Sequence, residues 1–290
     1  MAVTCDFTYE RPESLKKALD FLAKNKALVL AGGTDITVRI KEKITTPEAL
    51  LDIKAIKELA ELTYKNGELS IGALVTFTEL LDSPLIQKEF PMLSQTAKTV
   101  ACVGIRNRAT LVGNICCGMP SVDAAPLLLV YEAEAVLESS KGKRVIPMKD
   151  FFTGLKKTAL KPDELVTKII VKKPKEAHAG LYVKLGRYRG EDIAQSGLGI
   201  LLTGKDYKVA ACSVAIVPKR LPEVEKILSS TGDIEKAKAA LEKEISPITD
   251  IRATKEYRME MTKVMLERGV AAVKDLKAGK KVDISSLMGG

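Results

Sequence analysis

A short apolar run near the N-terminus ends abruptly in two glycines, and this feature constrains the fold more than any other. Residues 27–31 are apolar and are followed by Gly32, Gly33, Thr34 and Asp35. Glycine is favoured where a backbone lies flat against another group, because a Cβ atom would hold the two apart. Successive exposed N–H groups in such a turn form a concavity that suits phosphate oxygens. Alone, however, two glycines after a strand are typical of an ordinary turn.

A second segment of similar character lies further along the chain. Residues 105–126 carry glycine, proline and small polar side chains throughout, which predicts neither a helix nor an uninterrupted strand. The segment is nevertheless too apolar for a solvated linker. A compact, partly buried loop must have its backbone polar groups satisfied, and a bound ligand is one way to satisfy them.

Together the two segments resemble the flavin signatures of the FAD-binding subunit of the molybdenum hydroxylases, the family of xanthine dehydrogenase and aerobic carbon monoxide dehydrogenase. Residues 31–35 match the first signature, and residues 110–115 with 120–123 match the second. Val112 stands where many relatives carry glycine, which tightens the room for a diphosphate but leaves Gly113 in place. Further matches follow in order, so the resemblance spans nearly the whole chain: residues 151–154, 157–158, 164–165, 184–189, 192–194, 250–254 and 256–258.

The resemblance also implies which residues contact a non-covalent FAD. Backbone N–H groups and the hydroxyls of Thr34 and Thr110 would cradle the diphosphate, and Asp123 would accept hydrogen bonds from ribose or adenine-side donors. Asp123 could equally be the N-cap of a helix. The implied cofactor-binding residues are Leu28, Val29, Leu30, Ala31, Gly32, Gly33, Thr34, Asp35, Val100, Thr110, Leu111, Val112, Gly113, Asn114, Asp123, Val166 and Lys184.

The flavin ring itself would lie by Lys184 and by a residue near Leu165 or Val166. A cation there stabilises reduced anionic flavin by charge compensation. Without the resemblance, Lys184 is equally well explained as a surface lysine of a strand. Arg187 and Arg189 are candidate ligands for the phosphate of an incoming nicotinamide.

The implied fold class is α+β: a two-lobed FAD-binding domain of the PCMH type, then a C-terminal domain with an antiparallel sheet and helices. We expect the first lobe in residues 1–55, the second in residues 56–174 and the C-terminal domain in residues 175–290. Hydrophobic periodicity predicts the individual elements. Helices are expected at residues 12–25, 91–101, 222–228, 234–241 and from Thr254 to about 276, with another starting at the capping box of Thr76 and Glu79; strands are expected at 27–31, 49–53, 68–74, 168–172, 194–202 and 209–217, with a hairpin over 135–148.

Composition excludes several function classes. The net charge is +9, but the lysines are interleaved with acidic residues and tryptophan is absent, so no nucleic-acid partner is expected. No apolar run approaches the roughly 20 residues that span a bilayer. The N-terminus lacks the layout of a signal peptide, so a cytoplasmic location is expected.

Cysteine and histidine usage argues against metal centres in this chain. The five cysteines show no Cys-x-x-Cys pair, which favours reduced thiols. Cys116 and Cys117 lie inside the second flavin signature and are interpreted as small apolar residues. The single histidine, His178, is expected to be an exposed loop residue, and one histidine excludes a His-rich metal site. Covalent flavoenzymes of the wider superfamily carry their tethering histidine in the glycine-rich loop, so bound FAD is expected to be non-covalent.

The sequence therefore predicts an electron-transfer flavin subunit of a molybdopterin-containing dehydrogenase. Electrons would pass from a partner [2Fe–2S] subunit through FAD to NAD, a quinone, ferredoxin or another carrier. Molybdopterin and iron–sulfur clusters are expected only on partner subunits, because no motif for either is visible here. Two alternatives remain: a stand-alone PCMH-type FAD oxidoreductase, and a binding or scaffolding protein whose glycine loops are mere turns. No catalytic residue is assigned.

Overall fold

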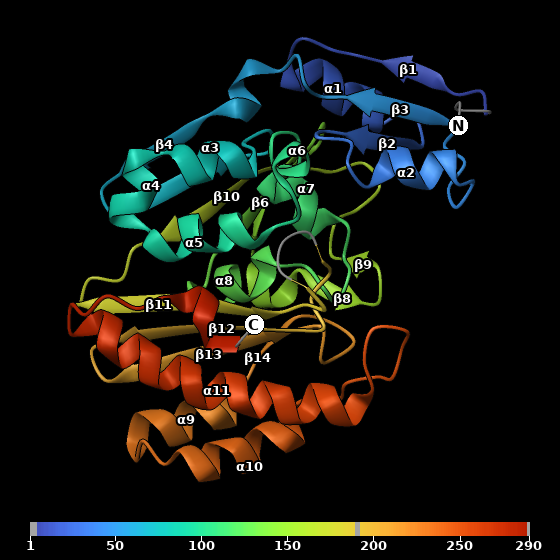
Figure 1. Cartoon of the computed structure of the whole chain (residues 1–290). Coiled ribbons are helices and arrows are strands. Elements are labelled where there is room, and N and C mark those ends of the chain that lie inside the picture. The colour runs from blue at the N-terminus through green and yellow to red at the C-terminus, as the bar shows by residue number, and fades with distance from the viewer. Residues whose placement is uncertain (1–4, 189–191, 289–290) are drawn as a thin grey trace.

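The computed structural model describes residues 5–188 and 192–288 as three layers of secondary structure stacked along one direction (Figure 1). Each layer is built around one main sheet, and the order of the layers follows the order of the chain. The predicted α+β class is confirmed. The three main sheets lie within residues 8–52, 62–172 and 178–220. The domain boundaries at residues 55 and 174 stay predictions.

The first lobe is a three-stranded parallel sheet of order β1-β3-β2 with two helices. Its elements are β1 (Thr8–Glu10), α1 (Leu15–Leu22), β2 (Ala27–Leu30), α2 (Ile36–Lys41) and β3 (Ala49–Asp52). The predicted helix and both predicted strands are present. Strand β1 was missed because its three residues are all exposed and carry no alternating pattern.

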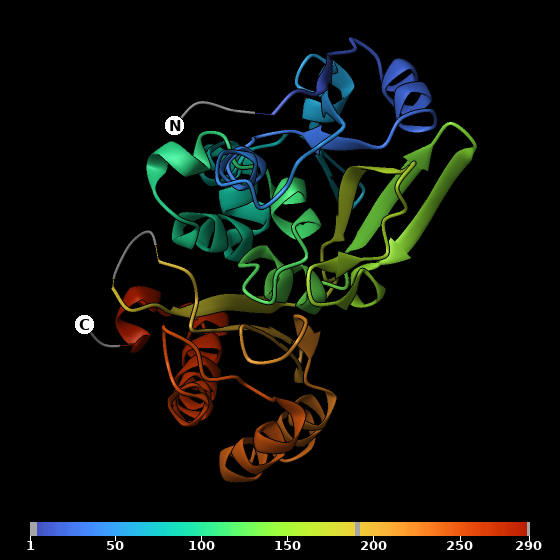
Figure 2. The same ribbon diagram turned by 90° about the vertical axis from the view of Figure 1, so that its right-hand side faces the viewer.

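The second lobe is an antiparallel sheet of order β4-β5-β10-β6-β7 covered by helices. Up to the second flavin signature its elements are η1 (Lys57–Ala60), β4 (Leu62–Lys65), β5 (Glu68–Gly72), α3 (Phe77–Asp82), α4 (Pro84–Glu89), α5 (Pro91–Thr99) and α6 (Val103–Arg106). From there they are α7 (Leu111–Cys116), α8 (Ala124–Val130), β6 (Glu134–Ser139), β7 (Gly142–Pro147), η2 (Met148–Asp150), β8 (Phe152–Gly154), β9 (Lys157–Thr158) and β10 (Leu165–Lys172). The capping box of Thr76 and Glu79 is present, and the β6–β7 hairpin forms the long arm in Figure 2.

The prediction that residues 105–126 form no helix is wrong, because α7 and the start of α8 lie within them. Helix α7 is short and capped by Thr110, whose hydroxyl accepts from the N–H of Gly113 at 3.0 Å. Pro126 lies in the first turn of α8. Backbone N–H groups there have no acceptor within the helix, so the N–H that proline lacks costs no helical hydrogen bond. Every residue of α8 is buried, so tertiary packing outweighs the unfavourable composition.

The C-terminal domain is a sheet of order β11-β12-β13-β14 with helices on its far side. Its elements are β11 (His178–Leu185), β12 (Ser196–Thr203), β13 (Asp206–Cys212), β14 (Lys219–Arg220), α9 (Pro222–Ser230), α10 (Ile234–Glu244), α11 (Lys255–Lys277) and η3 (Ile284–Met288). The predicted antiparallel pairing of β12 with β13 and the Thr254 cap of α11 are confirmed. His178 is not a loop residue: it begins β11, opposite Thr203.

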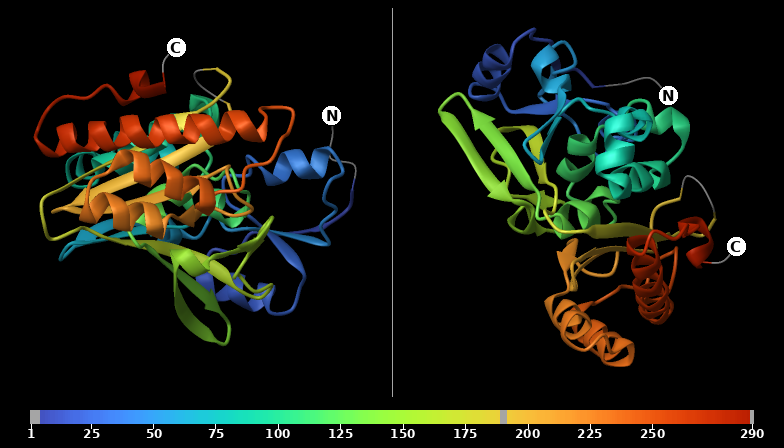
Figure 3. Two further views of the ribbon diagram at one scale, coloured as in Figure 1. Left: turned by 90° about the horizontal axis from the view of Figure 1, so that it is seen from below. Right: turned by 90° about the vertical axis from the view of Figure 1, so that its left-hand side faces the viewer.

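This sheet lies between two layers of helices. On one face it packs against α5 and α8 of the second lobe, and on the other against α9 and α11. The view from below in Figure 3 shows α9, α10 and α11 lying side by side over that second face. Helix α8 is thus enclosed between the second lobe and the C-terminal domain, and its N-terminus meets strand β11 at the junction.

Candidate functional site

The two lobes meet where the glycine turn after β2 touches the segment before α7. A Cβ atom on Gly32 would lie 1.9 Å from the carbonyl oxygen of Arg108, so only glycine permits this approach. Gly33 has a φ of +78°, which L side chains rarely adopt. The turn continues into α2 through a hydrogen bond from Thr37 N to Gly33 O of 3.2 Å. Both glycines are therefore required by geometry rather than by turn composition alone.

The same turn presents unused hydrogen-bond donors. Within the described ranges, no protein acceptor pairs with the backbone N–H groups of Gly32, Gly33, Thr34 or Asp35. The Asp35 carboxylate makes no cap hydrogen bond to α2 and lies 3.6 Å from the guanidinium of Arg39. Consecutive free N–H groups of this kind form the concavity that favours an anion.

The second signature is fixed by hydrogen bonds to neighbouring segments. The N–H of Leu111 donates to Val75 O at 3.2 Å, and the side-chain oxygen of Asn114 accepts from the N–H of Ala124 at 3.3 Å. Gly113 is exposed, whereas Val112 is buried in the core. The departure at Val112 therefore places its side chain in the core, away from the exposed face of Gly113.

A cleft of about 520 Å³ opens at this junction. Ala31, Gly32 and Thr110 of the predicted set line it, together with Lys54 and Arg108. Lys54 was not predicted, although β2 and β3 are parallel neighbours whose carboxyl ends reach the same edge. Lys54 follows β3 as Gly32 follows β2, and its ammonium group is 2.8 Å from buried Asp52. Arg108 brings positive charge to the cleft, whereas the ammonium group of Lys54 is paired with the Asp52 carboxylate.

Asp123 and Lys184 of the predicted set lie in a second, buried group. The ammonium group of Lys184 lies 2.9 Å from one carboxylate oxygen of Asp123, and the hydroxyl of Tyr182 donates to the other oxygen at 2.8 Å. The side chains of Lys184 and Asp123 are 9% and 10% exposed, so Lys184 is not a surface lysine. Lys184 also donates to Thr99 O at 3.0 Å.

Ionisation in this group follows from its burial. Burial raises the pKa of the Asp123 carboxyl, while the ammonium group of Lys184 and the hydroxyl of Tyr182 act in the opposite direction. Burial also raises the pKa of Tyr182 well above its usual range, so its hydroxyl remains a donor to Asp123. The side chain of Asp123 makes no N-cap hydrogen bond to α8, because both of its oxygens face β11.

Of Val100 and Val166, only Val100 is placed beside the buried group. Val100 follows the last residue of α5, next to the carbonyl that Lys184 binds, and Val166 lies in β10. Both side chains are buried, at 5% and 1% exposure. Asn114 links the second signature to the buried group, because its side-chain oxygen accepts from the N–H of Ala124, the residue after Asp123.

Comparison with known proteins shows the family of the chain. The family model described as "FAD binding domain in molybdopterin dehydrogenase" matches residues 5–174, and the one described as "CO dehydrogenase flavoprotein C-terminal domain" matches residues 181–273. The chain belongs to the FAD-binding medium subunits of the molybdenum hydroxylases. The family predicted from the sequence is thus confirmed.

Individual relatives align over almost their whole length. The carbon monoxide dehydrogenase medium chain of Afipia carboxidovorans is 31% identical over 279 residues, which cover 92% of this chain and 96% of the relative. The xanthine dehydrogenase FAD-binding subunit of Escherichia coli O157:H7 is 31% identical over 281 residues, covering 91% and 96%. A solved structure of carbon monoxide dehydrogenase from Hydrogenophaga pseudoflava superposes with a TM-score of 0.90 at 29% identity, covering 94% of this chain and 99% of that chain.

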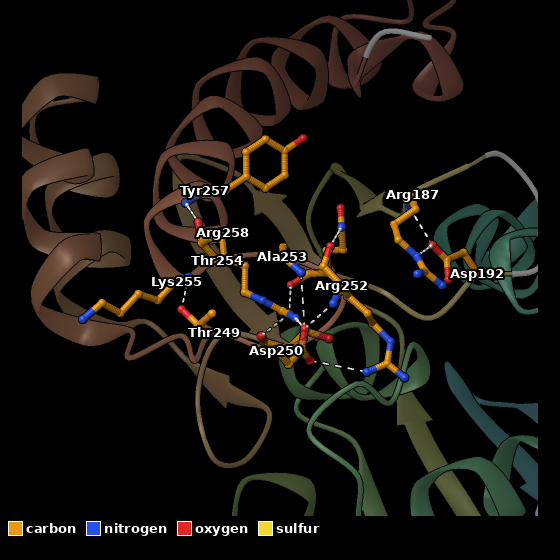
Figure 4. A network of polar contacts seen from close by, with 12 residues as sticks. Arg187, Asp192, Thr249, Asp250, Arg252, Ala253, Thr254, Lys255, Tyr257 and Arg258 are labelled. Carbon is orange, nitrogen blue, oxygen red and sulfur yellow. Dashed lines mark hydrogen bonds and ion pairs between the residues drawn. The ribbon is translucent and has the colours of Figure 1, made fainter.

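In this medium subunit the C-terminal signature around Asp250 forms a hydrogen-bonded network centred on Arg258, here called the clasp (Figure 4). Arg258 of α11 is 3% exposed; its guanidinium donates to Asp250 at 2.7 Å and to the carbonyl oxygens of Gln195 and Ser213. Tyr257 is 46% exposed, because the buried stripe of α11 passes through Arg258 instead. The clasp ties the loop before α11 to the sheet.

The other residues singled out from the sequence have simpler roles. Arg187 lies against Asp192, its Nε 3.5 Å from the carboxylate, and Arg189 lies outside the described residues. Burial raises the pKa of Cys116 to about 12 and also raises the pKa of Cys117, whose thiol donates to Asn114 O at 2.8 Å. Among the described residues there is no cluster of metal-ligating side chains and no helix long and apolar enough to cross a membrane.

Proposed function

We propose that this subunit transfers electrons from a partner's [2Fe–2S] cluster, through non-covalently bound FAD, to NAD or another acceptor. FAD would supply the redox centre, which the side chains of this chain cannot. The medium-chain names of its relatives support membership of a complex of several subunits. We propose that an iron–sulfur subunit and a molybdopterin-binding large subunit complete that complex. We also propose that this subunit acts in the cytoplasm.

The observation that carries the proposal is the junction of the two lobes. Within the described residues the N–H groups of residues 32–35 have no protein acceptor, and Gly32 lines the cleft together with Thr110 and the cation of Arg108. A diphosphate needs such a combination of free backbone donors and cations. The residues present therefore fit the phosphate end of FAD.

The buried group fits the ring end. An ammonium group has three N–H donors, and Lys184 uses two of them, on Asp123 and on Thr99 O. Within the described residues the third has no protein acceptor, and the side chain is paired with Asp123 at 9% exposure. A cation held in this way favours negative charge on the group beside it. Lys184 would thereby orient the flavin ring and tune its reduction.

The proposal is tested by purifying the tagged chain from its native host and analysing what accompanies it. We expect FAD in the visible spectrum, together with an iron–sulfur subunit and a molybdopterin-binding subunit. A single yellow polypeptide that turns over a substrate by itself would instead establish the stand-alone oxidoreductase. A colourless preparation that does not take up added FAD would contradict the flavin proposal and favour a scaffolding protein.

A further inference from the structure

Strand β11, which carries Lys184, is an edge strand of its sheet. Its partner on one side is β12, and Tyr182 lies opposite Gly199. In an antiparallel pair, alternate residues direct their N–H and C=O groups away from the partner strand. Tyr182 is such a residue, and both its groups are bound by one side chain. Gln95 of α5 donates to Tyr182 O at 2.8 Å and accepts from Tyr182 N at 2.9 Å.

The next contact along the same helix and strand involves Lys184. One turn after Gln95, the carbonyl of Thr99 accepts from the Lys184 ammonium group at 3.0 Å. Four helical residues advance about 6 Å and two strand residues about 6.6 Å. The spacing of the two contacts is therefore nearly the same on α5 as on β11. Together they fix the position of the strand along the helix.

The position of β11 along α5 determines which side chains of the strand reach the Asp123 carboxylate. The hydroxyl of Tyr182 and the ammonium group of Lys184 reach the two oxygens of the same carboxylate. Both side chains start from the short stretch of β11 whose backbone Gln95 holds. Apolar packing of β11 against α5 would resist separation, but it is non-directional and would tolerate sliding. Directional hydrogen bonds from Gln95 prevent sliding.

We infer that Gln95 is a positioning residue: it sets the register of β11 on α5 and thereby aims the free N–H of Lys184 at the flavin ring. The inference rests on the proposed function, because only bound FAD gives that N–H a ligand. Gln95 itself acts through Tyr182 and Lys184, and it is separated from Tyr182 by 87 positions in the sequence.

The test compares Gln95→Met with Gln87→Met in the full-length subunit, purified with any partners. Methionine keeps the volume and packing of glutamine but removes its hydrogen bonds. Gln87 of α4 also donates to a backbone carbonyl, that of Leu81 at 2.8 Å, but its side chain is exposed. A third variant, Gln95→Glu, keeps the acceptor for Tyr182 N and loses the donor to Tyr182 O. Thermal unfolding confirms that each variant is folded.

Two readouts separate the inference from the proposed function. The first is the rate at which an amine reagent modifies Lys184, followed by peptide mass spectrometry, which needs no cofactor. The second is the ratio of dissociation constants for oxidised and reduced FAD, which a purely structural role would not change. We expect Gln95→Met to speed modification of Lys184 several-fold and to shift the ratio about tenfold against reduced FAD, about 30 mV for a two-electron couple. Gln95→Glu should lie between it and the wild type, and Gln87→Met should match the wild type.

Unchanged modification of Lys184 in Gln95→Met would overturn the inference whatever the flavin does. Faster modification with an unchanged ratio would show that the register of β11 has no bearing on the cofactor, which also overturns it. Absence of FAD binding by the wild type would contradict the proposed function instead, and the modification rates would then show only whether Gln95 holds the strand.

Discussion

Gly32 lies so close to the carbonyl of Arg108 that the backbones of the two lobes touch without an intervening side chain. The contact joins residues 76 positions apart, and the Arg108 side chain returns to it by donating to Gly32 O at 3.4 Å. It brings the free N–H groups of the first signature beside the second signature. The relative placement of the two lobes at the cofactor loops thus depends on one glycine.

Replacing that glycine should weaken the junction. In Gly32→Ala the Cβ would collide with main-chain atoms, which cannot rotate away, so we expect a loss of about 1–3 kcal/mol in the free energy of unfolding. Urea unfolding of the full-length chain measures it. Gly104→Ala is the matched control, because nothing lies within 4 Å of a Cβ there. Equal stability of the two variants would contradict the account of the junction.

The buried pair of Asp123 and Lys184 should behave as a unit. Lys184→Met leaves a buried carboxylate without its cation, and removal of one partner of such a pair typically costs about 3–5 kcal/mol. In the double variant with Asp123→Asn no uncompensated charge is left, so its loss should be clearly smaller than the sum of the two single losses. Denaturant unfolding of all four proteins provides the cycle. Additive losses would show that the two side chains do not interact.

Substitution of two neighbouring residues of α11 should reduce stability by very different amounts. Arg258→Met removes the hydrogen bonds of a 3% exposed guanidinium and leaves Asp250 and two carbonyl groups without it, so we expect at least about 3 kcal/mol of destabilisation. Tyr257→Ala changes a side chain that is 46% exposed and should cost about 0.5 kcal/mol or less. Thermal melts distinguish the two. The reverse order would mean that the register of the helix differs from the one described.

The bidentate pair of Glu164 and Arg144 predicts a pH dependence. Both hydrogen bonds measure 2.7 Å, and the guanidinium holds the pKa of Glu164 below its ordinary value of 4.5. A lowered pKa in the folded state contributes stability above the ordinary value, and that stability is lost as pH falls through the folded pKa. The wild type should therefore lose about 1–2 kcal/mol more than Glu164→Gln when pH is lowered from 6 through this range. Parallel stability curves for the two proteins would refute this.

The parts of the site that the sequence predicted are those with local signatures. Gly33 needs its positive φ, Thr110 caps the helix that follows it, and Thr76 forms its capping box with Glu79 three residues on. Such contacts depend on spacing within one turn, which the sequence shows directly. The continuous apolar runs that form β12 and β13 are equally local, and their antiparallel pairing is as predicted.

The parts that were missed depend on long-range contacts. Gln95 meets Tyr182 across 87 positions, and Lys54 reaches the cleft only because β3 lies beside β2. Helix α8 forms despite an unfavourable composition because burial on all sides stabilises it. Arg258 points inward for a similar reason, because the carbonyl groups that accept its hydrogen bonds belong to Gln195 and Ser213, which are distant in the sequence. A single sequence contains no direct record of these contacts.

The most direct test of the central claim is the FAD content of Gly33→Glu, measured beside Gly67→Glu. Both glycines have φ near +80°, so the backbone strain is comparable, but Gly67 lies in the β4–β5 turn with nothing within 4 Å of a Cβ. A carboxylate at position 33 would stand in the proposed diphosphate cradle. We predict that the purified Gly33→Glu protein loses its FAD while Gly67→Glu retains it. Equal FAD content in the two folded variants would contradict the account.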